Sequence, residues 1–154
     1  MARAGFTAIH TGRIRFGKDG RWYCDDEVIP NRAICRLYAR AMTVGDDGLA
    51  RLQLGEDRAV VDVEDTPWVV TTVDRTADGG FIVTLNDETV EPLDLGTLRV
   101  GADHVLYCRA KGGREVRFLR PAQYELARHA EPDARGRAVI VVGGTPVQLP
   151  DGAA

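Results

Sequence analysis

The sequence contains no serine, which excludes hydrolysis by a Ser-His-Asp triad. Its three cysteines, Cys24, Cys35 and Cys108, lie far apart, and no two of them form a Cys-x-x-Cys pair. An odd number of widely spaced cysteines is typical of reduced thiols in a cytosolic protein. We therefore interpret all three as small buried residues and not as nucleophiles or metal ligands.

Metal-binding and membrane-spanning patterns are also lacking. His10, His104 and His129 form no His-x-His or His-x-x-x-His pair, so no zinc site and no other cofactor is expected. The longest apolar run is residues 138–142, far shorter than the roughly 20 residues that span a bilayer. The first residues show no uninterrupted apolar segment of a signal peptide, so we expect a cytoplasmic protein that does not contact a membrane.

Charge is divided into three blocks along the 154 residues, whose net charge is −3. Residues 1–44 carry eight basic and four acidic side chains, residues 45–104 carry four and fourteen, and residues 105–154 carry eight and five. An acidic central block argues against a nucleic-acid-binding protein, which needs a continuous basic face. The flanking basic blocks can instead fold around the acidic one.

Most of the chain has the pattern of short strands separated by turns that contain glycine. The predicted strands are residues 13–16, 21–24, 27–29, 49–54, 59–64, 68–73, 81–85, 104–109, 115–119, 138–142 and 146–149. The segment 68–73 is rich in β-branched residues, which predicts a strand buried on both faces at the centre of a sheet. Trp68 is expected to be buried with it.

Two helices interrupt the strands. The first is predicted over residues 31–43, with Asn31 as its N-cap. Its apolar positions have helical spacing and predict one buried face, formed by Ile34, Leu37, Tyr38, Ala41 and Met42. The second helix begins near Pro121 and ends before Pro132, with Ala122, Leu126 and Ala130 on one face and Tyr124 beside them.

An offset of 88 positions aligns residues 28–55 with 116–143 without a gap, with seven identities in 28 positions. The order of elements also agrees, which indicates an internal repeat. The predicted fold class is therefore α+β, with two similar subdomains that each hold a curved antiparallel sheet packed around one helix. We place the subdomains at residues 1–58 and 59–154 of a single compact chain.

Five blocks of the sequence, in order, resemble an uncharacterised bacterial family, domain of unknown function 1285 (DUF1285). The first block includes RIR at 13–15, DGRW at 19–22, IPNR at 29–32 and LYA at 37–39, and the last is RPAQYEL at 120–126. Between them lie VEDTPW at 63–68, TLNDE at 84–88 and LRV at 98–100. The resemblance implies the same two-subdomain α+β fold. It carries no established activity, although it is compatible with a binding role in signalling or regulation.

Carboxylates are the plentiful candidates for chemistry. Glu64 and Asp65 on one segment, and Asp87 and Glu88 on another, could converge on Mg²⁺ or Ca²⁺ or form an acid/base pair. Adjacent residues of a strand point to opposite faces, so each pair can offer one carboxylate. In the alternative interpretation, Asp65 and Asp87 accept hydrogen bonds from the backbone at turns.

Arg32 and Arg120 stand at equivalent places where the two helices begin. A cation is unfavourable at a helix N-terminus, so each arginine is expected to meet an anion. The anion is either a phosphate or carboxylate ligand, or an internal carboxylate such as Glu64, Asp65 or Asp87.

Aromatic residues are scarce, at 6% of the chain. Trp22, Trp68 and Phe118 are therefore predicted mainly in the core, although they could line a ligand pocket.

We therefore expect a non-catalytic cytosolic binding or regulatory module for a small anionic ligand or a protein partner, as a monomer or homodimer. The candidate ligand-binding residues are Trp22, Arg32, Glu64, Asp65, Trp68, Asp87, Arg120 and Tyr124. The alternative is a divalent-metal-dependent hydrolase or transferase that uses the clustered carboxylates.

Overall fold

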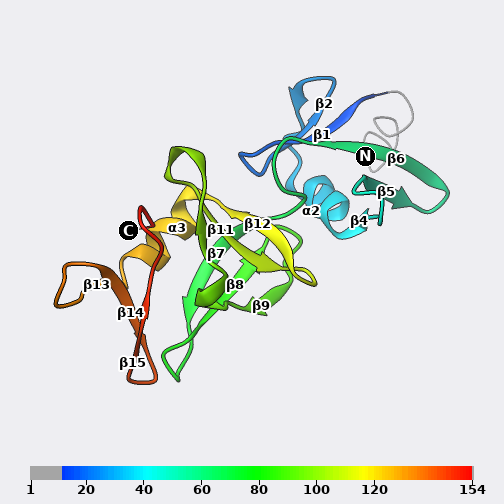
Figure 1. The fold of residues 1–154 in the computed structure, drawn as a ribbon. Helices are drawn as coiled ribbons and strands as arrows, with labels where there is room; N and C mark the ends of the chain where they lie inside the picture. The colour runs from blue at the N-terminus through cyan, green and yellow to red at the C-terminus, as the bar shows by residue number, and fades with distance from the viewer. Residues whose placement is uncertain (1–11, 154) are drawn as a thin grey trace. The chain divides into compact units, whose positions relative to one another are not determined.

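A computed structural model describes residues 12–153, and the chain divides into two compact units with the boundary after Trp68 (Figure 1). The described part of each unit contains one α-helix and one six-stranded, mostly antiparallel sheet. The predicted fold class, α+β with two similar sheet-and-helix subdomains, is confirmed. The boundary that the sequence places after residue 58 falls within strand β6 (Asp57–Val63), which lies in the first unit.

The first unit is built on a sheet with the strand order β3-β2-β1-β6-β5-β4. At its centre β1 pairs with β6 in parallel, and every other neighbouring pair is antiparallel. The strands besides β6 are β1 (Ile14–Phe16), β2 (Trp22–Cys24), β3 (Glu27–Val28), β4 (Met42–Val44) and β5 (Ala50–Leu54). Each outer group of three strands is therefore a meander, and the sheet joins the first strand of one to the last strand of the other.

Alternation along β1 separates the core of this unit from its outer face. Ile14 and Phe16 are buried, whereas Arg15 between them lies on the opposite face. Trp22 packs between Phe16 and Tyr38, at ring-centroid distances of 4.8 and 5.5 Å. Trp22 therefore belongs to the hydrophobic core.

Helix α2 (Arg32–Ala41) begins where the sequence predicts, because the side chain of Asn31 accepts hydrogen bonds from the N–H groups of Ala33 and Ile34. It ends two residues early, since Met42 already begins β4 and pairs with β5. The prediction that Leu37 is buried is wrong: the residue is 44% exposed, and the fully buried positions are Tyr38 and Ala39. Of the other predicted positions, Tyr38 and Met42 are buried, and Ile34 and Ala41 are partly buried.

The second unit is built on a sheet with the order β10-β11-β12-β7-β8-β9, again with a central parallel pair, β12 and β7. Its strands are β7 (Val69–Arg75), β8 (Phe81–Leu85), β9 (Val90–Pro92), β10 (Arg99–Val100), β11 (Leu106–Ala110) and β12 (Arg114–Phe118). Val69, Val70 and Val73 are buried, and the prediction that this segment forms a central strand is confirmed. Burial on both faces holds only at its start, because Thr71 is partly buried and Thr72 is exposed. Two short 3-10 helices, η1 (Leu95–Thr97) and η2 (Ala102–His104), lie before and after β10.

Helix α3 (Arg120–Ala127) follows β12 and packs against β7. Ala122 and Leu126 are buried as predicted, with Gln123. The helix is shorter than predicted, because the chain turns at Arg128 and enters a strand at Glu131. Ala130 therefore lies outside the helix.

A third sheet completes the second unit and shows the internal repeat directly. Its strands β13 (Glu131–Pro132), β14 (Ala138–Val142) and β15 (Thr145–Gln148) form a meander after α3, as β4, β5 and β6 do after α2 (Figure 1). The strand registers agree at the offset of 88 residues. Thr43 pairs with Arg51 and Glu131 with Val139, and Arg51 pairs with Val60 and Val139 with Gln148. The repeated element is thus a helix followed by a three-stranded meander.

Candidate functional site

A cavity of about 380 Å³ lies in the second unit beside the first turns of α3. Its walls come from three parts of the chain: η2, helix α3 and the segment after β15. Figure 1 shows this last segment returning beside α3 near the C-terminus. The lining residues are His104, Arg120, Gln123, Tyr124, Ala127, Gly152 and Ala153. Its volume is within the range of small-molecule sites, and two of the predicted ligand-binding residues, Arg120 and Tyr124, line it.

Arg120 and Gln123 hold the η2 wall in place. Arg120 donates from Nη2 to the carbonyl of Asp103 at 2.7 Å and from Nη1 to the carbonyl of His104 at 3.3 Å. Gln123 donates from Nε2 to the same His104 carbonyl at 2.7 Å and accepts from the N–H of Leu106 at 3.0 Å. Helix α3 thus fixes both sides of the turn that precedes β11.

The wall formed by η2 has an uncommon backbone conformation. Asp103 and His104 are consecutive non-glycine residues in the left-handed region, each with φ of 57°. Such residues cost of the order of 1–3 kcal/mol each and persist where surrounding contacts hold them. Here the contacts are those from Arg120 and Gln123, which present His104 to the cavity.

Gly152 lies next to the imidazole of His104 in the lining of the cavity. It has φ of +87°, and a Cβ built on it would lie 3.1 Å from Nδ1 of His104. A side chain at this position would therefore be strained and would crowd the imidazole. The next residue, Ala153, is buried and also lines the cavity.

Tyr124 supplies an open aromatic surface at the mouth of the cavity. Its side chain is 72% exposed, and it lies one helical turn after Arg120, on the same side of α3. Ala127, one turn further, also lines the cavity and adds little volume. The lining therefore combines a guanidinium, an imidazole and a phenol ring with small apolar walls.

The other predicted arginine lies elsewhere. Arg32 is exposed at the start of α2 in the first unit and forms no ion pair with any residue that the structure describes. The internal partners that the sequence proposes for it, Glu64 and Asp65, are also in the first unit. The contact of Arg120 likewise differs from the one proposed, because backbone carbonyls of η2 take the place of Asp87.

The predicted aromatic residues Trp22, Trp68 and Phe118 are all buried. Trp68 donates from Nε1 to the carbonyl of Ala39 at 3.3 Å, a bond that joins the end of the first unit to α2. All three aromatic residues are therefore part of the hydrophobic core.

The carboxylate of Asp87 is held by its own unit. It accepts from the N–H of Thr89 at 3.1 Å and from its hydroxyl at 2.6 Å, and it forms an ion pair with Lys111. Burial alone would raise the pKa of Asp87, but the hydrogen bonds from Lys111 and Thr89 outweigh it and lower the pKa below its usual value. The interpretation of Asp87 as an acceptor at a turn therefore agrees with its geometry.

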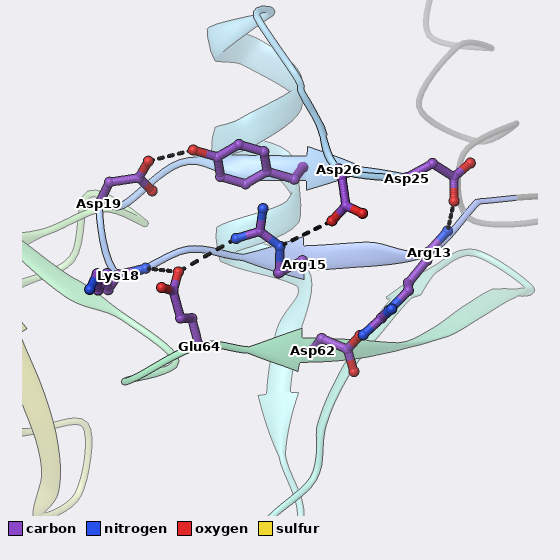
Figure 2. A network of polar contacts seen from close by, with 9 residues as sticks. Arg13, Arg15, Lys18, Asp19, Asp25, Asp26, Asp62 and Glu64 are labelled. Atoms are coloured by element: carbon purple, nitrogen blue, oxygen red, sulfur yellow. Dashed lines mark hydrogen bonds and ion pairs between the residues drawn. The ribbon is translucent and has the colours of Figure 1, made fainter.

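Glu64 belongs to a polar network on the outer face of the first sheet. Figure 2 shows side chains from β1, β2 and β6 and from the turns beside them meeting across neighbouring strands. Glu64 accepts from the N–H of Lys18 at 3.0 Å and pairs with Arg15 at 3.5 Å, and Arg15 also lies 3.7 Å from Asp26 and 4.0 Å from the ring of Tyr23. Three further contacts belong to the network: the side chain of Arg13 with Asp62, the N–H of Arg13 with Asp25 at 2.9 Å, and Tyr23 with Asp19. Asp65 follows as an exposed residue.

Within residues 12–153, no three His, Cys, Asp or Glu side chains are grouped so that they could hold a metal ion. Glu64 and Asp65 lie in the first unit, and Asp87 and Glu88 in the second. His10, one of the histidines considered from the sequence, lies outside the described residues.

Sequence reasoning did not predict the other five lining residues as site residues: His104, Gln123, Ala127, Gly152 and Ala153. His104 and Gly152 are 48 positions apart, and no local pattern relates them. Gln123 directly follows Ala122, which was predicted to be buried, and a polar residue buried in a helix indicates an internal hydrogen bond.

Two solved structures have the fold of this chain. A DUF1285 family protein from Silicibacter pomeroyi DSS-3 superposes with a TM-score of 0.66 at 19% identity, over 88% of this chain and 78% of that one. A DUF1285 family protein from Shewanella baltica OS155 superposes with a TM-score of 0.60 at 18% identity, over 77% of this chain and 92% of that one. The chain therefore has the fold of DUF1285 family proteins, and both findings support the resemblance drawn from the sequence motifs.

No protein-family model and no curated protein matches the chain. Among the described residues, no helix is both long enough and apolar enough to cross a membrane.

Proposed function

We propose that the protein is a non-catalytic binding module and that the cavity beside α3 accepts a small anion. The observation that carries this proposal is the position of Arg120, which lines the cavity and whose guanidinium lies against the carbonyls of Asp103 and His104. Its two hydrogen bonds to η2 use one hydrogen on each Nη atom, so three of its five N–H donors have no partner among the described residues. None of the described lining residues is acidic.

The composition of the lining supports binding without catalysis. The cavity contains no cysteine, and the chain contains no serine, so the usual nucleophiles of acyl transfer are lacking. His104 could move a proton, but no described carboxylate of the lining orients its imidazole. Such a site would sense a ligand without converting it, as a regulatory or signalling module does.

The metal-dependent alternative has weaker support. Glu64 is engaged by Lys18 and Arg15, and Asp87 by Lys111 and Thr89. Each carboxylate would have to leave a cationic partner before it could bind a metal ion. A protein partner, the other ligand class that the sequence left open, fits a concave site of this size less well than a small molecule does.

The test is a titration of the full chain with sodium acetate, benzoate, phosphate and sulfate, followed by the backbone amide signals of His104, Tyr124 and Gly152 in NMR spectra. We expect at least one of these anions to shift the three signals saturably. A Gly152→Ala variant, whose Cβ would crowd His104, is expected to bind that anion about fivefold or more weakly.

Gly136→Ala is the matched control. Gly136 also has a left-handed backbone, with φ of +78°, but a Cβ there would meet nothing within 4 Å. It shares the strain of the first variant without narrowing the cavity. If no anion shifts the three signals at tens of millimolar, or if both variants weaken binding equally, the proposed site is wrong.

A further inference from the structure

Resting on the proposed function of the cavity, we propose that the anion it accepts is a planar aromatic carboxylate. The first reason is the number and form of the positive charges. Arg120 is the one permanently charged residue among the described lining residues. A single guanidinium neutralises a monoanion, and its flat fork matches the two oxygens of a carboxylate.

The second reason is that the start of α3 is poorly equipped for phosphate. Phosphate sites at helix N-termini use several free backbone N–H groups. Here Pro121 has no N–H, and the N–H of Leu119 is donated to the carbonyl of Val70. The remaining N–H groups of this turn belong to Arg120 and Ala122, too few to surround a tetrahedral dianion.

The third reason is the surface next to the guanidinium. Tyr124 is 72% exposed and lines the cavity one turn from Arg120, so its ring is accessible to a group that binds Arg120. Ala127, Gly152 and Ala153, which have almost no side chain, form the small apolar part of the lining. An aromatic ring stacks on tyrosine with a gain beyond simple apolar burial.

Together these features match a ligand with a carboxylate directly attached to a flat ring. Benzoate is the simplest probe of this class. Cyclohexanecarboxylate has the same charge and a similar size but cannot stack, acetate has the carboxylate alone, and inorganic phosphate represents the competing anion class.

The experiment compares the dissociation constants of these four probes for the full chain, measured by NMR from the His104 and Gly152 amide signals. We expect benzoate to bind about fivefold more tightly than cyclohexanecarboxylate, and more tightly than acetate or phosphate. Tyr124→Leu should abolish the preference for benzoate, and Tyr124→Phe should retain it. Arg128→Gln, an exposed change on the turn just after α3 and outside the lining, should leave all four constants unchanged.

Three results would overturn the inference, and they differ from a failure of the binding site itself. Equal binding of benzoate and cyclohexanecarboxylate, or phosphate binding as tight as benzoate, would show an anion site of another class. If Tyr124→Leu still prefers benzoate, the ring of the bound benzoate does not stack on Tyr124. If no probe shifts the cavity signals, the proposed function falls, and this inference falls with it.

Discussion

At the scale of single residues, an ion pair in the second unit joins charged side chains from two different turns. Lys111, in the turn between β11 and β12, meets Asp87 through its side chain, and its N–H donates to the carboxylate of Glu91 at 3.0 Å. The side chain of Asp87 is only 4% exposed. A carboxylate so far from water depends on its partner, because an unpaired buried charge is costly. The two hairpins that carry these residues are thereby held together.

The substitution Lys111→Met should therefore destabilise the protein by about 3–5 kcal/mol, because the buried carboxylate of Asp87 loses its cationic partner. The free energy of unfolding, measured by urea denaturation at pH 7, checks this. The double variant Asp87→Asn/Lys111→Met should recover part of the loss. Arg137→Met, which breaks the exposed pair with Asp133, is the control and should cost less than about 1 kcal/mol. Equal losses in the two single variants would contradict the assignment.

Trp68 is a second residue whose burial leads to a prediction. Its side chain is 6% exposed and its Nε1 donates to Ala39. Trp68→Ala should cost about 3–5 kcal/mol, as expected for a buried large aromatic residue. Trp68→Phe keeps most of the apolar volume and loses the hydrogen bond, so it should cost less. A loss below about 1 kcal/mol for the alanine variant would indicate a role in recognition instead of packing.

At the scale of elements, the first hairpin turn in each copy of the repeat is held by an aspartate, but the two aspartates stand at different positions of the repeat. Asp47, in the turn between β4 and β5, accepts from the N–H of Leu49 and from two nitrogens of Arg51, at 3.1 and 2.6 Å. Between β13 and β14, Asp133 accepts from the N–H groups of Arg135 and Arg137. Both turns use an aspartate that pairs with an arginine four residues later, but the two aspartates do not occupy equivalent positions of the repeat.

The Asp47 turn should make stability depend on pH in the acid range. Hydrogen bonds from Arg51 and Leu49 lower the pKa of Asp47 to about 2. Since the folded pKa lies below the unfolded one, the stabilisation is fully present above the ordinary value of 3.8 and is lost as the pH falls toward about 2. The difference in urea midpoint between the protein and Asp47→Asn should thus shrink from pH 5 to pH 2. A difference that stays constant over this range would contradict the prediction.

At the scale of the whole chain, the two copies of the helix-and-meander element differ in how their strands join a larger sheet. In the first unit the last strand of the meander, β6, also pairs with β1 and completes a six-stranded sheet. In the second unit β15 pairs with β14 alone among the described strands, and α3 packs against β7 of another sheet. The third sheet therefore stands as a small separate layer, and the segment that follows it becomes a wall of the cavity.

The three cysteines differ in burial, so their alkylation rates can be used to follow unfolding. Cys108, in β11, is 1% exposed, and burial raises its pKa to about 12. Cys24 and Cys35, in the first unit, are only partly buried. In native conditions at pH 8, iodoacetamide should label Cys108 much more slowly than the other two, since the thiolate is the reactive form. Mass spectrometry of labelled peptides measures the three rates. In urea above the unfolding transition the rates should converge, and fast labelling of Cys108 in the native protein would contradict the structure.

Much of the fold follows from local patterns in the sequence. Glycine-containing turns between runs of β-branched residues predicted the longer strands. Asn31 predicted the start of α2, and the alignment at an offset of 88 residues predicted the repeat. The strands that these patterns missed, such as β9 and β10, have two or three residues each and lie toward the edges of their sheet. Such short segments become strands only because a neighbour pairs with them.

The sequence by itself determined the fold class and the order of most elements, because these depend on spacing within a few turns of chain. It also proposed Arg120 and Tyr124, which line the cavity, as ligand-binding residues. Only the tertiary structure decided that Leu37 is exposed and that His104 meets Gly152. It also decided that Arg120 binds two carbonyls of a left-handed turn. These outcomes depend on contacts between segments distant in sequence, and the packing of those segments, which no local pattern encodes, forms the cavity.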